Sequence, residues 1–318
     1  MSTSWRPAAS IDRLRRRSRL IARLRAFLEA RGLWEVETQI LDTVGTTDPH
    51  IHPLSTEIGA PHAPRRLYLH TSPEFHMKRL LAAGSGPIYQ IARVFRDQER
   101  GPRHLLEFTL LEWYRPGWDH RRLMDEVAQL LCEVAEAPPA RRLSYRQVFQ
   151  QHLGVDPHHT PTEALHELAR DHGLTPPDDL DRDALLDLLM GALLEPRLGQ
   201  DTPLFIHDYP ASQAALARIR PGDPPLAERF ELYWRGMELA NGFHELTDPE
   251  EQRRRFLDER RRRRQHGLAD IPHDQWLIEA LEAGLPPCAG VALGVDRLFM
   301  ILSEAENIDQ VVAFPQRI

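Results

Sequence analysis

The chain has 318 residues, of which 42% are hydrophobic and 27% are charged, and its formal net charge is −7 at pH 7. These values are typical of a globular enzyme with one large domain or two smaller ones. The acidic balance argues against a protein that coats nucleic acids, and no apolar run approaches the roughly 20 residues that cross a membrane. Cys132 and Cys288 lie far apart without a CxxC pattern, so the cysteines indicate neither a disulfide framework nor a zinc site. We therefore expect a cytoplasmic protein.

The N-terminal part of the chain predicts a helix followed by short strands. Ser10 is a suitable N-cap, apolar residues recur at helical spacing between residues 11 and 28, and Gly32 is a suitable end. A strand-like run follows at residues 34–38, and a second one at residues 67–70 comes after a loop.

A second helix and a long hairpin come next. Ser72 as N-cap, Pro73 in the first helical position and Glu74 in the first turn match the preferences of a helix start. Residues 87–96 and 105–114 are predicted strands joined by a polar loop. They form the hairpin.

The remainder predicts helices and further strands. Residues from about 119 to 200 are mostly helical by pattern, and we interpret them as an insertion packed on the sheet. Strands are expected at residues 204–206, 228–239 and 290–293, and an arginine-rich helix at about 248–266. The last strand leads into the final helix. We therefore predict an α+β fold in which a mostly antiparallel sheet is flanked by helices.

Three separate segments carry the strongest functional signal. The first is Phe95-Arg96 with Glu107-Phe108-Thr109, the second is residues 238–243, and the third is residues 294–297. They supply an arginine beside an aromatic strand end, a carboxylate before a strand of small residues, and an arginine at a helix start. Together they resemble the catalytic core of the class II aminoacyl-tRNA synthetases, in particular the lysine branch. This resemblance implies ATP-driven activation of an amino acid as its adenylate.

The resemblance assigns an ATP site. An isolated arginine on a strand is more often a surface ion-pair partner, but a guanidinium can also hold a phosphate with two parallel hydrogen bonds. The resemblance implies that Arg96 binds the α-phosphate and the amino-acid carboxylate. It also implies that Phe108 stacks on one face of adenine, and that Arg297 covers the other face of adenine and reaches the γ-phosphate. His104 reaches the γ-phosphate too. The catalytic role falls on Arg96 and Arg297, and the other ATP-binding positions are Gln98, Leu105, Glu238, Leu239 and Gly294.

Glu231 and Glu238 are the metal ligands that the resemblance implies. Their simpler interpretation is that they form surface ion pairs with a basic helix. Side chains seven residues apart face opposite sides of a regular strand, so joint ligation needs a bend, for which Gly236 is suitable. Mg²⁺ fits such a pair because it takes few carboxylates and shares its shell with ATP phosphates.

The resemblance also indicates a diamino acid as the substrate, because a buried ammonium requires a charged partner. Glu74 is expected to bind the amine near the carboxyl end, and Glu245 and Tyr114 the terminal ammonium. The remaining substrate-binding positions are Ser72, Pro73, Asn241 and Ala292. Ala292 stands where lysyl-tRNA synthetases usually have glycine. Its methyl group either excludes one lysine isomer, by about 1–3 kcal/mol, or only fills the pocket wall.

Nearly the whole chain resembles the elongation factor P–lysine ligases. The segments that carry this resemblance are residues 71–80, 111–116, 210–214, 240–248 and 290–297. It implies that (R)-β-lysine, or lysine, is adenylated with ATP and Mg²⁺ and joined to a lysine side chain of elongation factor P. A homodimer and no use of tRNA are implied as well.

The domain expectation follows from where the pattern begins. It starts near residue 11, so we expect one catalytic domain over residues 1–318 without an anticodon-binding domain. Three positions depart from the family. Gln39 replaces a proline at the usual dimer contact, Gln98 replaces a glutamate and predicts weaker ATP binding, and Leu105 replaces an asparagine that would offer a hydrogen bond.

Alternatives remain at this point. A stand-alone lysyl-tRNA synthetase is the nearest, and the Leu105-Leu106 change favours a catalytically silent regulatory paralogue. The arginine runs at residues 13–19 and 253–264 predict solvated helix faces in the first place. A docking surface for an acidic protein such as elongation factor P is the second interpretation of these runs.

Overall fold

The computed structural model describes residues 5–59, 64–98 and 100–316. Contacts divide the chain into two compact units. The first unit comprises Met1–Gly117, Thr247–Cys288 and Ala292–Ile318, and the second comprises Trp118–Leu246 and Ala289–Val291. Within the described residues, no helix is both long enough and apolar enough to cross a bilayer.

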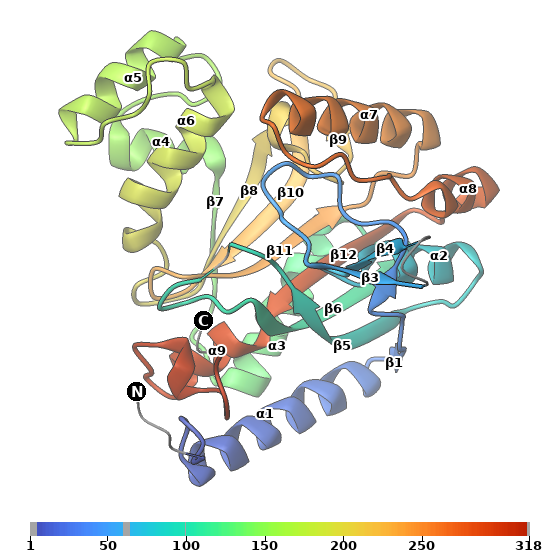
Figure 1. The fold of residues 1–318 in the computed structure, drawn as a ribbon. Coiled ribbons are helices and arrows are strands. Elements are labelled where there is room, and N and C mark those ends of the chain that lie inside the picture. Colours follow the sequence, from blue (N-terminus) through green and yellow to red (C-terminus); the bar gives the residue numbers. More distant parts are fainter. Residues whose placement is uncertain (1–4, 60–63, 99, 317–318) are drawn as a thin grey trace. The chain divides into compact units, whose positions relative to one another are not determined.

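Helix α1 (Ile11–Glu29) begins the first unit, at the blue end of the chain in Figure 1. The Ser10 side chain accepts a hydrogen bond from the backbone N–H of Arg13, which confirms the predicted N-cap. Leu20, Leu24 and Leu28 are buried at helical spacing along one face. The amphipathic pattern therefore predicted this helix correctly.

The first unit contains the predicted long hairpin. Strand β5 (Ile88–Phe95) pairs antiparallel with β6 (Glu107–Pro116), and Phe95 lies opposite Glu107. The short strand β1 (Trp34–Glu35) pairs parallel with β5. A separate small sheet has the order β2 (Leu41–Asp42), β4 (Arg65–Leu69) and β3 (Ser55–Ile58). The sequence did not predict β2 or β3.

Four further helices belong to the first unit, namely α2 (Glu74–Ala82), α7 (Pro249–Gln265), α8 (Gln275–Gly284) and α9 (Val295–Leu302). Helix α8 packs against both α2 and α7. The predicted start of α2 was one residue early, because the helix begins at Glu74 and not at Pro73. The sequence did not predict α8.

The second unit is built on a hairpin of strands β10 (Leu226–Tyr233) and β11 (Glu238–His244). The expected single strand over residues 228–239 is therefore wrong. Arg235 and Gly236, with φ of 51° and 65°, reverse the chain between the two strands. The predicted bend at Gly236 is confirmed, and it is a complete turn.

Strand β8 (Leu204–Pro210) pairs antiparallel with β10 and parallel with β7 (Arg141–Ser144), and β9 (Ile219–Arg220) also pairs with β10. Strand β12 (Cys288–Gly294) has residues in both units. It extends the order β1-β5-β6-β12 in the first unit and begins the order β12-β11-β10-β8-β7 in the second. Most strand pairs are antiparallel, and the predicted α+β fold is confirmed.

The helices of the second unit are α3 (His120–Ala135), α4 (Tyr145–Leu153), α5 (Thr162–Asp171) and α6 (Arg182–Leu189). Figure 1 shows α4, α5 and α6 gathered together. Their apolar faces form one cluster with β8, in which Phe149, Leu165, Leu185 and Ile206 are fully buried. Strand β7 lies in a segment that was expected to be mostly helical.

Candidate active site

Arg96 lies directly after β5, and the structure brings it to Phe108 of β6. The backbone N–H of Arg96 donates to the carbonyl of Leu106 (2.9 Å). Its side-chain Nε donates to the carbonyl of Thr71 (3.3 Å), and the guanidinium carbon lies 5.2 Å from the centroid of the Phe108 ring. A planar cation therefore stands beside an aromatic face, an arrangement suited to a phosphate and a purine.

Arg297 and His104, the two positions expected to reach the γ-phosphate, contact each other directly. Arg297 lies in the first turn of α9, for which Gly294 is the N-cap. Its Nη2 is hydrogen-bonded to Nε2 of His104, and its Nε donates to the carbonyl of Arg103 (3.4 Å). His104 belongs to a tight turn that is closed by two backbone hydrogen bonds with Gly101 (3.1 and 3.3 Å).

An ion pair that the sequence analysis did not single out fixes α9 against β6. Asp296 is 2% exposed and accepts a hydrogen bond from the backbone N–H of Thr109 (2.7 Å). Arg17 of α1 pairs with Asp296 and also donates to Thr109 Oγ1 (2.9 Å). These bonds hold the first turn of α9 at the residue next to Phe108. The available signal was a carboxylate at the start of an otherwise apolar helix.

The positions that depart from the family have distinct environments. Leu105 is buried, so its side chain packs against protein. Gln98 has a φ of 65°, and its backbone N–H donates to Asp97 Oδ1 (2.9 Å). Ala292 and Phe108 both pack against a small apolar cluster of β5 and β6, formed by Ala92, Val94 and Leu110.

Glu112 of β6 is the main residue that the sequence analysis missed. Its side chain is buried and accepts hydrogen bonds from Ser72 Oγ and from the hydroxyl of Tyr114, both at 2.7 Å. Ser72 also accepts from the backbone N–H of Glu74 (3.0 Å), so it joins the start of α2 to Glu112. The signal in the sequence was an acid between Leu111 and Trp113, two apolar residues of a strand.

Glu112 and Glu74 form an acidic pair around one buried lysine. Lys78 is 1% exposed and donates from Nζ to Glu74 Oε1 (2.6 Å). Burial, together with the nearby Glu74 carboxylate, raises the pKa of Glu112 to about 7. One lysine cannot neutralise two carboxylates, so an ammonium group from a ligand would complete the charge balance.

A second buried carboxylate, Glu231 of β10, already has a cation. Arg229 pairs with its Oε1, and the hydroxyls of Tyr209 and Tyr233 donate to its Oε2. Burial and Glu231 raise the pKa of both phenols well above their usual range, so both groups stay protonated and donate. Arg229 also donates to Asn241 Oδ1 (3.3 Å).

The remaining predicted residues of the second unit lie on β11 or directly after it. Glu238 is the register partner of Tyr233, and Asn241 is the partner of Glu231. Leu239 and Glu245 are buried. Gly242 is required here because a Cβ atom would lie 2.4 Å from the Phe230 ring.

The predicted metal ligands can be tested against these contacts. Tyr233 donates to Glu231 and lies opposite Glu238, so the turn at Gly236 brings the strand positions of both glutamates to one end of the hairpin. Carboxylates are suitable Mg²⁺ ligands beside phosphate oxygens, so the donor types fit. However, the Arg229 guanidinium already holds Oε1 of Glu231. A metal ion at Glu231 would therefore compete with Arg229.

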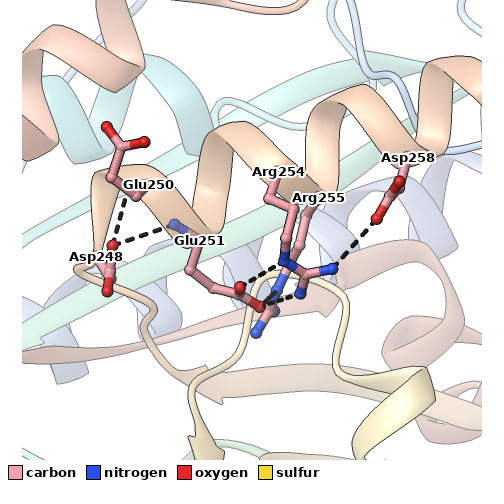
Figure 2. Close-up of polar contacts among 6 residues, drawn as sticks. All are labelled: Asp248, Glu250, Glu251, Arg254, Arg255 and Asp258. Atoms are coloured by element: carbon pink, nitrogen blue, oxygen red, sulfur yellow. Dashed lines mark hydrogen bonds and ion pairs between the residues drawn. The ribbon is translucent and has the colours of Figure 1, made fainter.

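Two arginines of α7, Arg254 and Arg255, are engaged with acids of the same helix (Figure 2). Glu251 pairs with Arg254 and Arg255, and Asp258 pairs with Arg254. Arg263 is 3% exposed and donates to the carbonyls of Ala269 and Asp48. These contacts favour the interpretation of a solvated, ion-paired helix face.

Comparisons with known proteins agree with these observations. The family model of the class II tRNA synthetases (D, K and N) matches residues 3–318. The elongation factor P–(R)-β-lysine ligase of Vibrio parahaemolyticus is 51% identical over 320 residues, which cover 99% of each chain. The ligase of the same name from Vibrio vulnificus is 50% identical, again over 99% of each chain. That of Haemophilus influenzae is 48% identical over 98% of this chain and 97% of its own.

Proposed function

Because the chain belongs to the class II tRNA synthetases (D, K and N), we propose that it is an ATP-dependent ligase that attaches (R)-β-lysine to a lysine side chain of elongation factor P. The relatives of that name, similar over almost their whole length, support the substrate and the acceptor. The structural observation that carries the proposal is the neighbouring pair of carboxylates, Glu74 and Glu112. Lys78 donates to Glu74, Ser72 donates to Glu112, and the charge of Glu74 helps to raise the pKa of Glu112. This pair suits a diamino acid.

The first half-reaction is activation of the amino acid. An oxygen of the substrate carboxylate attacks the α-phosphorus of ATP, a mixed anhydride forms, and pyrophosphate leaves. Arg96 is positioned to hold the negative charge that develops on the phosphate, and Phe108 to stack on the base. Arg297 and His104 bind the γ-phosphate. We also assign Gln98, Leu105, Leu239 and Gly294 to ATP binding, by resemblance to the family.

Mg²⁺ would neutralise part of the phosphate charge when it is bound. We assign Glu238 as its first ligand and Glu231 as its second. Arg229 pairs with Glu231 and also donates to Asn241. Binding of Mg²⁺ by Glu231 therefore requires the guanidinium to turn away from Glu231 and toward Asn241.

The amines of the substrate define its specificity. Glu74 and Glu112 bind ammonium groups on the first unit, with Ser72, Pro73 and Tyr114 beside them. Glu245 and Asn241 are assigned on the second unit. An ammonium group favours the ionised form of Glu112, whose pKa is raised to about 7, so substrate binding and ionisation are coupled. Ala292 packs with Phe108 and is assigned to the pocket wall.

The second half-reaction transfers the aminoacyl group to protein. The ε-amine of the acceptor lysine attacks the carbonyl carbon of the adenylate, an amide bond forms, and AMP leaves. No tRNA takes part. An elongation factor works in the cytoplasm, so the proposal places the enzyme there.

We also propose a homodimer, with one catalytic domain over residues 1–318 and a helical insertion at 119–200. Trp34, Ile40 and Leu41, near Gln39 at the expected dimer contact, expose 51%, 42% and 44% of their surfaces and supply apolar area for it.

The intact mass of elongation factor P after incubation with this protein, ATP, Mg²⁺ and (R)-β-lysine, without tRNA, tests the proposal. The expected result is a gain of one lysyl unit, which disappears when Arg96→Ala replaces the wild type. No gain with the wild type, on an acceptor that another ligase modifies, would contradict the proposal and favour a silent paralogue. Charging of tRNA instead would favour a lysyl-tRNA synthetase.

A further inference from the structure

A cluster of three side chains lies away from the residues assigned to the reaction. Phe243 of β11 lies opposite Arg229 of β10. His244 is the residue after Phe243, and Glu228 is the residue before Arg229. Side chains alternate along a strand, so they project from the face of the hairpin opposite Arg229. His120, the first residue of α3, completes the cluster, and one ligand atom of each side chain lies within 4.8 Å of the others.

His120 is a buried polar group that lacks a hydrogen bond. Its surface is 2% exposed, and neither ring nitrogen has a hydrogen-bond partner among the described residues. A buried donor and acceptor left in this way cost free energy, and such groups in folded proteins commonly mark a ligand or ion. Burial lowers the pKa of His120 to about 4, so the ring is neutral at pH 7 and keeps a lone pair for a metal. The ring stacks on that of His244 at a centroid distance of 6.4 Å.

His244 and Glu228 are already joined by a hydrogen bond. Nδ1 of His244 lies 2.7 Å from Glu228 Oε2, where a metal ion could replace the shared proton. Arg218 and Arg220 lie 3.9 and 3.8 Å from the Glu228 carboxylate, near the outer limit of an ion pair. Arg220 has a closer partner in Asp208 (2.8 Å), so its charge is largely compensated there. The Glu228 carboxylate can therefore turn toward His120 without leaving Arg220 unpaired.

We propose that His120, His244 and Glu228 form a binding site for a divalent transition metal, with Zn²⁺ as the preferred ion. Two imidazoles and one carboxylate are a common zinc ligand set, and Mg²⁺ prefers oxygen ligands. Tetrahedral Zn²⁺ with bonds of about 2.0–2.1 Å needs ligand atoms about 3.4 Å apart. The three ligand atoms lie within 4.8 Å of one another, so the largest separation has to shorten by about 1.4 Å on binding. Three protein ligands leave the fourth position to water.

The site would join α3 to both strands of the hairpin, on the face opposite Arg229 and its partner Glu231. Its occupancy would order these strands without contributing a ligand to the reaction. None of the three residues is among those assigned to the ligase reaction. This site differs from the carboxylates assigned to Mg²⁺ in the metal ion that it is proposed to bind.

Isothermal titration of the full chain with Zn²⁺, after removal of metals with a chelator, tests the proposal. The wild type is expected to bind one Zn²⁺ per chain, and Co²⁺ is expected to give the visible absorption of a tetrahedral complex. His120→Leu is expected to weaken Zn²⁺ binding by more than about 100-fold. This variant replaces a ring with unsatisfied nitrogens by an apolar side chain, so it should fold, and its thermal unfolding without metal verifies this.

His159→Ala is the matched control, because His159 also lies beside a carboxylate, Asp156 (3.1 Å), but its side chain is 58% exposed. It should bind Zn²⁺ as the wild type does. Three results would overturn the proposal: no Zn²⁺ binding by the folded wild type, unchanged binding in folded His120→Leu, or an equal loss in His159→Ala.

Discussion

Glu112 in the first unit and Glu231 in the second are both buried carboxylates with tyrosine hydroxyls as partners, yet their charge environments differ. Glu231 pairs with its own cation, Arg229. Glu112 accepts hydrogen bonds from the neutral hydroxyls of Ser72 and Tyr114, and burial together with a second carboxylate, Glu74, raises its pKa. A carboxylate with an internal cation stabilises the fold, whereas one that lacks sufficient positive charge is suited to a cationic ligand.

The largest effect on activity is expected from Glu112→Gln. This change should lower kcat/KM for (R)-β-lysine in ATP–pyrophosphate exchange at least about 30-fold, because a buried ammonium loses its charged partner. The corresponding loss of binding free energy is about 2–5 kcal/mol. The free energy of unfolding should stay equal or rise, since a buried charge is removed. An unchanged kcat/KM would show that Glu112 does not face the substrate.

Glu231→Gln should give the opposite pattern. It leaves Arg229 as a buried charge without its carboxylate partner, so the free energy of unfolding should fall by about 3–5 kcal/mol. Urea unfolding followed by circular dichroism measures this value, with Glu112→Gln as the matched variant. Equal stability of the two variants would remove the distinction between the two carboxylates.

The pH dependence sharpens the comparison further. The pKa of Glu112 is raised from 4.5 to about 7 in the folded protein, which therefore binds the proton more tightly than the unfolded chain. Without substrate, stability should fall as pH rises between these two values, and Glu112→Gln should remove that part of the slope. In the same range kcat/KM for (R)-β-lysine should increase with pH, because the ionised carboxylate binds the ammonium. A decrease through pH 7 would contradict this assignment.

The smallest effect is expected from Ser72→Ala. It removes one neutral hydrogen bond of 2.7 Å to Glu112, worth about 0.5–1.5 kcal/mol. The loss should reduce kcat/KM by about 2- to 13-fold. It should also move the midpoint of the pH profile upward, because the ionised carboxylate has one donor fewer. A midpoint that stays in place would argue that Ser72 only supports the start of α2.

The sequence predicted features that depend on local pattern and missed those that depend on tertiary contacts. The spacing of apolar residues predicted α1, and the strand-like runs predicted the β5–β6 hairpin. A bend at Gly236 was predicted correctly, but residues 228–239 were interpreted as one strand, whereas the chain reverses there between β10 and β11. Strand β7 was missed since its pairing partner, β8, lies about 60 residues later in the chain.

The same division holds within the site. Family resemblance pointed to Arg96 and Arg297, and the structure adds their contacts with Phe108 and His104. The resemblance could not show that Asp296 is bonded to Arg17, because α1 and α9 are separated by most of the chain. Glu112 stood within a segment that carried the resemblance, but its importance depends on Ser72 and on Glu74, which come from another element.

The most direct test of a site for a diamino acid compares two substrates on the wild-type protein. ATP–pyrophosphate exchange should be measured with (R)-β-lysine and with (R)-3-aminohexanoic acid, which has the same chain but no terminal amine. We expect exchange with the diamino acid and little or none with the other compound. Equal exchange rates with both would contradict this expectation, because the terminal ammonium would then contribute nothing to recognition by the buried carboxylates.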